Sequence, residues 1–208
     1  DPGYDEFDES TPLSPINNYG LSKWMIAEVL RKTFRAEPDW SIAILRYFNP
    51  VGAHESGLIG EDPNGIPNNL MPFISQVAVG KRDHLNVFGN DYPTADGTGC
   101  RDYIHVMDLV DGHLQALKVL NHQPQLLTVN LGTGSSTSVL ELVRAFEKAS
   151  GKKVPYQICP RRAGDKAAYW TNPAKAKTVL NWQAKRGIEE MCADTWRWQS
   201  MNPNGYED

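Results

Sequence analysis

The sequence predicts an α/β fold, because helical and strand patterns alternate along its 208 residues. Residues 17–36 carry apolar side chains at helical spacing, whereas residues 41–47 form a short apolar run with the length of a buried strand. Further along, Ser138 and Glu141 have the spacing of a capping box that starts a helix. The composition, with 40% hydrophobic and 22% charged residues, is ordinary for a globular domain.

The other elements follow in chain order. Residues 1–10 are acidic and rich in turn-forming residues, which indicates a loop, and Asn17 or Asn18 can cap the first helix. Glycines and prolines make residues 52–69 a long irregular stretch, of the kind that often carries function. We expect helices over residues 70–79, 107–121, 139–151 and 188–201, a short helix opened by Pro173, and strands over residues 85–88, 126–131 and 154–159.

Charge and cysteine usage exclude some classes of protein. The net charge of -4 argues against nucleic acid or an anionic membrane as partner, and no apolar run approaches the ~20 residues of a membrane span. Cys100, Cys159 and Cys192 are widely spaced without a C-x-x-C pair, so we expect no disulfide framework, no metal site and a cytoplasmic location. The chain starts with Asp, and we expect it to lack a signal peptide and to begin within a longer protein.

Tyr19 and Lys23 are four positions apart, which places them on one face of a helix. A phenol titrates near pH ~10 in water, and a nearby positive charge favours its phenolate form. Such a pair can exchange a proton with a substrate hydroxyl near neutral pH. The spacing is common by chance, and a surface tyrosine beside a solvated lysine is the plainer interpretation of it alone. The surrounding motifs must therefore decide whether this is a catalytic pair or a surface pair.

The sequence lacks the glycine pattern of a dinucleotide site, since no G-x-x-G-x-x-G or G-x-G-x-x-G follows a strand and opens a helix. Gly132-Thr133-Gly134 comes after the strand expected at residues 126–131, but no third glycine follows. We interpret this stretch as a turn. If a dinucleotide cofactor is used, we expect its phosphate-binding loop to lie outside this sequence.

Several further stretches accompany the Tyr19–Lys23 pair. They are Arg46-Tyr47-Phe48-Asn49-Pro50-Val51-Gly52-Ala53-His54, Asn68-Asn69-Leu70-Met71-Pro72, Asp91-Tyr92-Pro93-Thr94, Gly97-Thr98-Gly99 and Arg101-Asp102-Tyr103-Ile104-His105-Val106-Met107-Asp108. Together and in this order, they resemble the UDP-glucose 4-epimerases, members of the extended short-chain dehydrogenase/reductases. The resemblance covers nearly the whole chain, which is similar to the last three-fifths of such an enzyme.

The resemblance implies a fold and an activity. The fold would be the C-terminal part of a Rossmann-type NAD-binding fold plus a smaller α/β substrate domain, with the N-terminal Rossmann half missing. Residues 1–50 would end the dinucleotide-binding domain, and residues 51–208 would form mainly the UDP-sugar-binding domain, with some segments returning to the first. The activity would be NAD-dependent interconversion of UDP-galactose and UDP-glucose by transient oxidation at sugar C4. Such enzymes usually pair as homodimers through helices that include the Tyr-x-x-x-Lys helix.

The resemblance also assigns catalytic and cofactor-binding roles. Tyr19, as a phenolate, would take the proton of the sugar C4 hydroxyl. Lys23 would bind the nicotinamide ribose and favour that phenolate. Tyr47 and Phe48 would lie against nicotinamide and sugar. The chemistry of the redox step would come from NAD, and the protein would supply position and charge.

A second set of residues would bind the substrate. Asn49 would hydrogen-bond the sugar nucleotide, and Tyr169 would limit the sugar pocket. Arg101 and Arg162 would hold the diphosphate, since planar guanidinium groups suit phosphate oxygens. The remaining members of the set are Asn69, Leu70 and Phe88 at the uridine-diphosphate site, Asp165 at a ribose hydroxyl, and Tyr103.

Alternatives remain open at this point. Arg161 and Arg162 could be a solvated pair, and His105 and Asp108 more often fix a turn or cap a helix than touch substrate. A neighbouring enzyme, such as a nucleotide-sugar 4,6-dehydratase or decarboxylase, shares the Tyr-x-x-x-Lys pair, although the stretches at residues 49–52 and 68–72 favour the epimerase. The last alternative is an inactive truncated fragment, because the glycine-rich loop and the Ser or Thr partner of the tyrosine are missing from the sequence.

Overall fold

The computed structural model describes residues 5–206 and confirms the α/β class. Its helices are α1 (Asn18–Ala36), α2 (Leu70–Ala78), α3 (Val106–Leu120), α4 (Val139–Ser150), α5 (Ala174–Leu180) and α6 (Ile188–Met201). Its strands are β1 (Asp5–Phe7), β2 (Ser41–Tyr47), β3 (Asn49–Val51), β4 (Leu85–Phe88), β5 (Cys100–Arg101), β6 (Tyr103–His105), β7 (Gln125–Leu131), β8 (Thr137–Ser138), β9 (Tyr156–Cys159) and β10 (Ala168–Thr171).

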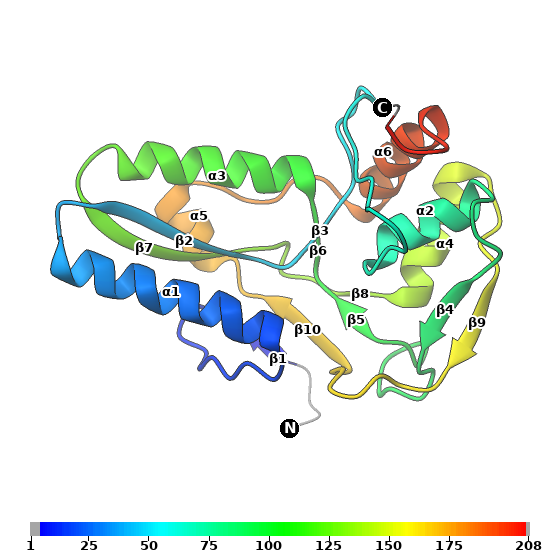
Figure 1. Cartoon of the computed structure of the whole chain (residues 1–208), viewed down its shortest axis with the longest axis horizontal. Coiled ribbons are helices and arrows are strands. Elements are labelled where there is room, and N and C mark those ends of the chain that lie inside the picture. Colours follow the sequence, from blue (N-terminus) through cyan, green and yellow to red (C-terminus); the bar gives the residue numbers. More distant parts are fainter. Residues whose placement is uncertain (1–4, 207–208) are drawn as a thin grey trace.

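One end of the elongated molecule is a three-layer arrangement around the parallel pair β2–β7 (Figure 1). On one face, Ile42 and Ile44 pack against Ala27 of α1. On the other face, Val129 and Leu131 pack against α3 and α5. Apolar side chains on both faces of the strands explain why the sequence of this pair reads as a continuous apolar run.

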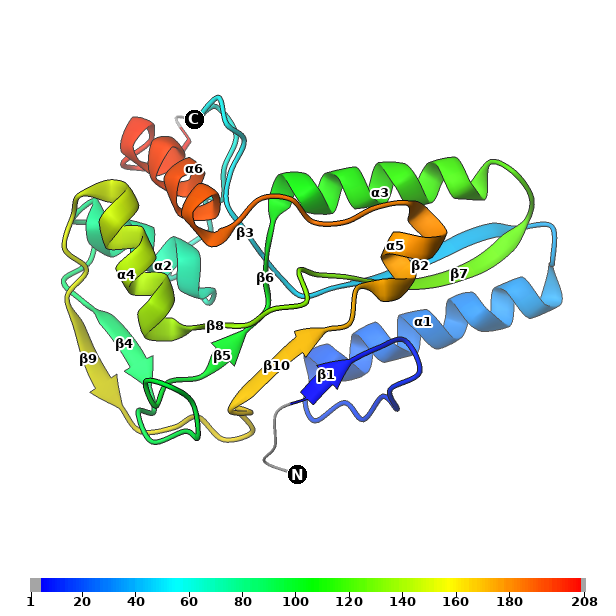
Figure 2. The same ribbon diagram turned by 180° about the vertical axis from the view of Figure 1, so that it is seen from behind.

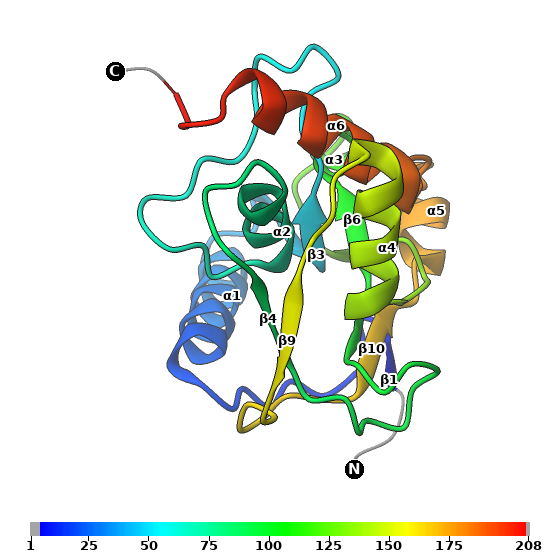
Figure 3. The same ribbon diagram turned by 90° about the vertical axis from the view of Figure 1, so that its right-hand side faces the viewer.

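The other end has its own hydrophobic core, formed mainly by α2, α4, α6 and β4, and β4 pairs in parallel with β9 (Figure 3). Phe146 of α4 and Ile74 of α2 are fully buried there. The capping box predicted at the start of α4 is present, because Ser138 Oγ accepts from Glu141 N at 3.0 Å and Ser138 N donates to Glu141 Oε2 at 2.7 Å. Gly151 ends this helix in the left-handed region with φ 66°, as its sequence position predicted.

Short strands join the two ends (Figure 2). Strands β1, β10 and β5 run parallel, β8 joins β5 in antiparallel orientation, and β3 pairs with β6. These strands have two to four residues, and none of them was expected from the sequence. Isolated strands of this length carry little pattern of their own, and their pairing comes from the tertiary fold.

The opening segment differs from the predicted loop. Residues 5–7 form β1, which pairs in register with β10, while the first four residues of the predicted loop lie outside the described part of the chain. Within residues 5–206, no helix is long and apolar enough to cross a bilayer. In the same range, no three His, Cys, Asp or Glu side chains gather as a metal site.

The apolar stripe of α1 divides into two parts. Leu30 and Phe34 pack against the sheet, whereas Met25, Ile26 and Val29 are more than half exposed. Within the described residues, β2 pairs with β7 alone. The outer face of α1 therefore presents apolar surface that this chain does not bury.

Candidate active site

The Tyr19–Lys23 pair lies at the start of α1. Asn17 caps this helix, since its Oδ1 accepts from Gly20 N at 2.8 Å. The cap fixes the first turn, and Lys23 Nζ then lies 5.2 Å from the centroid of the Tyr19 ring. Tyr19 is 72% exposed, so its hydroxyl is accessible to a ligand. The predicted helix and the predicted proximity of the two side chains are both confirmed.

The next predicted residues follow the carboxyl end of β2, where ligands of open parallel sheets usually bind. Tyr47 is half exposed, with its ring centroid 6.1 Å from that of His113. Phe48 turns toward Tyr169, and their ring centroids are also 6.1 Å apart. Asn49 is oriented by Asp102, whose carbonyl accepts from both the backbone N and the side-chain Nδ2 of Asn49 at 3.0 Å.

A second group of predicted residues forms what we call the arginine–aromatic cluster: Arg101, Arg162, Asp165, Tyr169 and Phe88. Asp165 lies between the two guanidinium groups, 2.9 Å from Arg162 Nε and 3.8 Å from Arg101 Nη2. Arg162 stacks over the ring of Phe88 at 4.9 Å from its centroid, and Arg101 over Tyr169 at 4.6 Å. Two cations and one carboxylate leave a net positive charge beside two aromatic faces, which suits an anionic diphosphate carrying a base or sugar.

The two arginines of this cluster are held differently. Arg101 Nη1 donates to the carbonyls of Cys100 at 2.8 Å and Lys166 at 3.0 Å, and its side chain is mostly buried. Arg162 is 57% exposed and holds Asp165 from the surface. Arg101 is therefore the pre-oriented donor, whereas Arg162 closes the cluster from the solvent side.

The adjacent residues Arg161 and Arg162 contact different partners. Arg161 Nε donates to Asp91 Oδ1 at 2.7 Å, and its guanidinium lies over Tyr92, 4.1 Å from the ring centroid. Arg161 thus fastens the loop after β4, and only Arg162 joins the arginine–aromatic cluster.

Three of the predicted substrate residues lie elsewhere. Asn69 precedes α2 and its Nδ2 donates to Glu61 Oε1 at 3.2 Å, while the neighbouring Leu70 packs partly against the core around α2. Tyr103 is buried in that same core, and burial raises the pKa of its hydroxyl well above the ordinary value. The position of Tyr103 is one of packing, because β6 directs this side chain inward among α2, α4 and α6.

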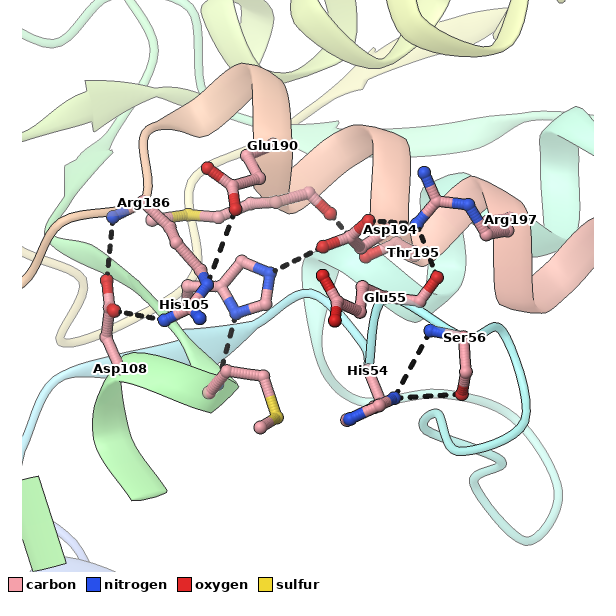
Figure 4. A network of polar contacts seen from close by, with 12 residues as sticks. His54, Glu55, Ser56, His105, Asp108, Arg186, Glu190, Asp194, Thr195 and Arg197 are labelled. Carbon is pink, nitrogen blue, oxygen red and sulfur yellow. Dashed lines mark hydrogen bonds and ion pairs between the residues drawn. The ribbon is translucent and has the colours of Figure 1, made fainter. Parts of the chain in front are cut away.

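His105 and Asp108 have the structural roles that the sequence favoured (Figure 4). His105 caps α3, with Nδ1 accepting from Met107 N at 3.0 Å, and its Nε2 lies 3.2 Å from Asp194 Oδ2. Because Nδ1 is an acceptor, the neutral ring carries its proton on Nε2, facing Asp194. Burial lowers the pKa of His105 and keeps the ring neutral.

Asp108 fixes the segment before α6. Its Oδ2 accepts from the backbone N of Lys185 and Arg186, both at 2.8 Å, and its Oδ1 accepts from the Arg186 guanidinium at 2.5 Å. The expectation that His105 and Asp108 hold the fold is confirmed. No role for Asp102 was predicted from the sequence, in which it stands between Arg101 and Tyr103.

Comparison with known proteins identifies the relatives of this chain. The family model described as GDP-mannose 4,6 dehydratase matches residues 1–195. The UDP-glucose 4-epimerase of Bacillus subtilis is 61% identical over 199 residues, and that of Mus musculus is 56% identical over 206 residues. These matches cover 96% and 99% of this chain and 59% of each relative, so the chain spans about three-fifths of their length.

The crystal structure of UDP-glucose 4-epimerase from Bifidobacterium longum, in complex with NAD+ and UDP, superimposes with a TM-score of 0.92 at 49% identity. It matches 97% of this chain, which covers 60% of that structure. The fold predicted from the resemblance is thus confirmed over that length. The chain belongs to the family that the GDP-mannose 4,6 dehydratase model describes, and the relatives it resembles within that family are UDP-glucose 4-epimerases.

Proposed function

We propose that this chain is the C-terminal three-fifths of a UDP-glucose 4-epimerase, which interconverts UDP-galactose and UDP-glucose by transient oxidation at sugar C4. One observation carries the proposal: an exposed Tyr19–Lys23 pair and an arginine–aromatic cluster occur in one chain that is 61% identical to a named epimerase. The pair suits proton exchange with a hydroxyl, and the cluster suits a diphosphate.

NAD is the proposed cofactor, and it supplies a reversible hydride acceptor when bound. Epimerases similar to this chain carry NAD in their crystal structures. The residues available here fit the nicotinamide end of such a cofactor, because Tyr47 is exposed at the carboxyl end of β2 and Phe48 follows it directly. Together with Tyr19 and Lys23 they form the proposed cofactor-binding set, whereas no glycine-rich phosphate loop occurs in the sequence.

The residues of this chain then divide the work of the reaction. Tyr19 takes the proton of the C4 hydroxyl and later returns it, and Lys23 favours the phenolate form of Tyr19. Arg101 and Arg162 hold the diphosphate while the 4-keto sugar rotates within the pocket and presents its other face. Phe48 and Tyr169, whose tilted rings have centroids 6.1 Å apart, bound the space in which the sugar turns.

The remaining substrate roles are proposed at the positions described above. Asn49 presents its oriented amide to the sugar nucleotide, Asn69 and Leu70 contact the uridine diphosphate from the start of α2, and Phe88 lies beside the base. Asp165 gives up part of its contact with the two guanidinium groups and binds a ribose hydroxyl instead. Tyr103 acts from the core, by supporting the strand that follows Arg101.

The larger organisation is proposed on the same basis. Residues 1–50 belong to the dinucleotide-binding domain and residues 51–208 mainly to the substrate domain, and α3, β7 and α5 return to the first. The exposed apolar side chains of α1, Met25, Ile26 and Val29, support a homodimer that pairs through this helix. The net charge of -4 and the unpaired cysteines support a cytoplasmic enzyme without nucleic-acid or membrane partners.

A test must distinguish epimerase from dehydratase, since the family model carries a dehydratase description. For this test, the completed enzyme is this chain preceded by the part of the Bacillus subtilis relative that it does not cover. Given NAD and UDP-galactose, it should form UDP-glucose, and Tyr19→Phe should abolish most of that product. Formation of a 4-keto-6-deoxy sugar instead would establish the dehydratase, and a folded, NAD-loaded protein without either product would refute the proposal.

A further inference from the structure

Asp102 is a fully buried carboxylate at the junction of the two hydrophobic cores, at 0% exposure. It occupies the single position between β5 and β6. Its oxygens accept hydrogen bonds from Thr133 N at 3.0 Å, Thr133 Oγ1 at 2.6 Å, Gly134 N at 3.2 Å and Thr171 N at 3.1 Å. A buried charge normally costs stability unless it is paired or well hydrogen-bonded, and this one is surrounded by donors.

The Gly132-Thr133-Gly134 turn is built around this carboxylate. A Cβ on Gly132 would lie 2.7 Å from Asp102 Oδ2 and 2.3 Å from Thr171 Cγ2, so only glycine fits there. Gly134 adopts φ +80°, which favours glycine as well. Successive backbone N–H groups in such a turn form a concavity for an anion. The anion in this turn is the side chain of Asp102 itself.

The backbone of Asp102 makes a second set of contacts. Its carbonyl oxygen accepts from both Asn49 N and Asn49 Nδ2 at 3.0 Å. One residue therefore fastens the segment after β2, the turn after β7 and the strand β10 to the β5–β6 junction. Two of these segments carry a residue of the proposed site. Asn49 lies in the segment after β2, and Tyr169 lies in β10.

We propose that Asp102 is a positioning residue of the substrate site, which holds Asn49, Arg101 and Tyr169 at the spacing that the sugar diphosphate requires. Asp102 acts through these neighbours, because it is itself buried and reaches no solvent. Arg101 precedes it in the chain and is the register partner of Tyr169 across β5 and β10. The proposal rests on the proposed function of the site and adds to it a residue with no contact to the substrate.

The replacement Asp102→Asn tests the role of the carboxylate, because asparagine is nearly the same size as aspartate but carries no charge. An asparagine side chain presents one acceptor oxygen and one NH₂ donor, and the NH₂ would face the N–H groups of Thr133, Gly134 or Thr171. Burial raises the pKa of the Asp102 carboxyl, and the hydrogen bonds from Thr133, Thr171 and Gly134 oppose that rise. The milder change Thr133→Val removes the 2.6 Å hydroxyl contact with Asp102, together with the contacts of that hydroxyl to the neighbouring Ser135, and Thr133→Ser restores them.

The experiment measures UDP affinity by titration calorimetry on folded protein, with thermal melting recorded for each variant. We expect Asp102→Asn and Thr133→Val to weaken UDP binding by about tenfold or more, as misplacement of a binding group does, and Thr133→Ser to bind nearly as the unmodified chain does. Asp96→Asn is the matched control. Asp96 also accepts from Thr98, Ser138 and Arg144, but it holds none of the proposed site residues.

The outcomes separate cleanly. Equal UDP affinity in Thr133→Val and the unmodified chain would overturn the proposal, and so would an equal loss in Asp96→Asn, which would reduce the effect to general destabilisation. If the unmodified chain binds no UDP at millimolar concentration, Asp102 has no site to position and the proposal also fails. UDP binding that follows the expected pattern in a completed enzyme without epimerisation would leave Asp102 in place and refute the proposed function instead.

Discussion

The guanidinium carbon of Arg101 lies 4.6 Å from the centroid of the Tyr169 ring, and the two residues are register partners across β5 and β10. This pairing places Arg101, the proposed hydrogen-bond donor to the diphosphate, beside the aromatic wall of the proposed sugar pocket. Phe7 and Phe48 flank the same ring, with centroids 6.0 and 6.1 Å away. The ring of Tyr169 is thus fixed from three sides, and a fixed aromatic side chain sets a firm limit on pocket size.

Shortening Tyr169 to Cys or Ser should enlarge the sugar pocket in the completed enzyme. The unmodified enzyme should prefer UDP-galactose and UDP-glucose, because the bulky ring leaves little room for an N-acetyl group at C2. The variants should turn over UDP-N-acetylglucosamine, measured as formation of UDP-N-acetylgalactosamine. Equal turnover of acetylated and plain sugars by the unmodified enzyme would place the size limit at another residue.

Replacing Arg162 by Ala should weaken UDP binding by about ten- to a hundredfold, the scale of a hydrogen bond to a charged group. Arg162 contacts Asp165 and Phe88 in the arginine–aromatic cluster. The neighbouring Arg161→Ala is a close control, because Arg161 is engaged by Asp91 and Tyr92 instead. Titration calorimetry with UDP should separate the two variants, and comparable losses in both would mean that general positive charge, not the cluster, attracts the nucleotide.

Protonation of His105 should destabilise the fold below about pH 6.5, its ordinary pKa. Burial lowers the pKa of the folded-state imidazole, so the unfolded chain binds the proton more readily. The stability that the neutral ring contributes is therefore fully present above the unfolded pKa and is lost as the pH falls through the folded one. In the neutral ring, Nδ1 accepts a hydrogen bond from Met107 N at 3.0 Å, and a proton on Nδ1 would instead face that N–H group.

Thermal melting between pH 7.5 and 5 checks the role of His105. His105→Asn keeps an oxygen that can cap α3 but removes the titrating group. This variant should melt at a lower temperature at pH 7.5, yet with a shallower slope between pH 6.5 and 5. Parallel pH profiles for the two proteins would assign the acid sensitivity to other groups.

The longer elements were predictable because local pattern and tertiary role agree in them. The cap at Asn17, the capping box at Ser138 and the apolar run at residues 41–47 each determine structure within a few residues. The short strands β5, β8 and β10 were missed because their pairing joins segments far apart in sequence. Asp102 was missed as a functional residue for the same reason, since its partners Thr133 and Thr171 lie more than thirty positions away.

The last prediction concerns Tyr19. In the completed enzyme, Tyr19→Phe should lower the rate of epimerisation by about two to four orders of magnitude, the usual range for loss of an acid–base group. Folding and NAD binding should change little, because Tyr19 is 72% exposed and its ring contacts Lys23 from the surface of α1. Tyr156→Phe is the control, since Tyr156 is an exposed tyrosine on β9 and should have the unmodified rate. Conversion of UDP-galactose to UDP-glucose, followed with melting temperature and bound NAD, checks all three expectations. A Tyr19→Phe enzyme with a nearly unmodified rate would show that the proton of the C4 hydroxyl goes to another group.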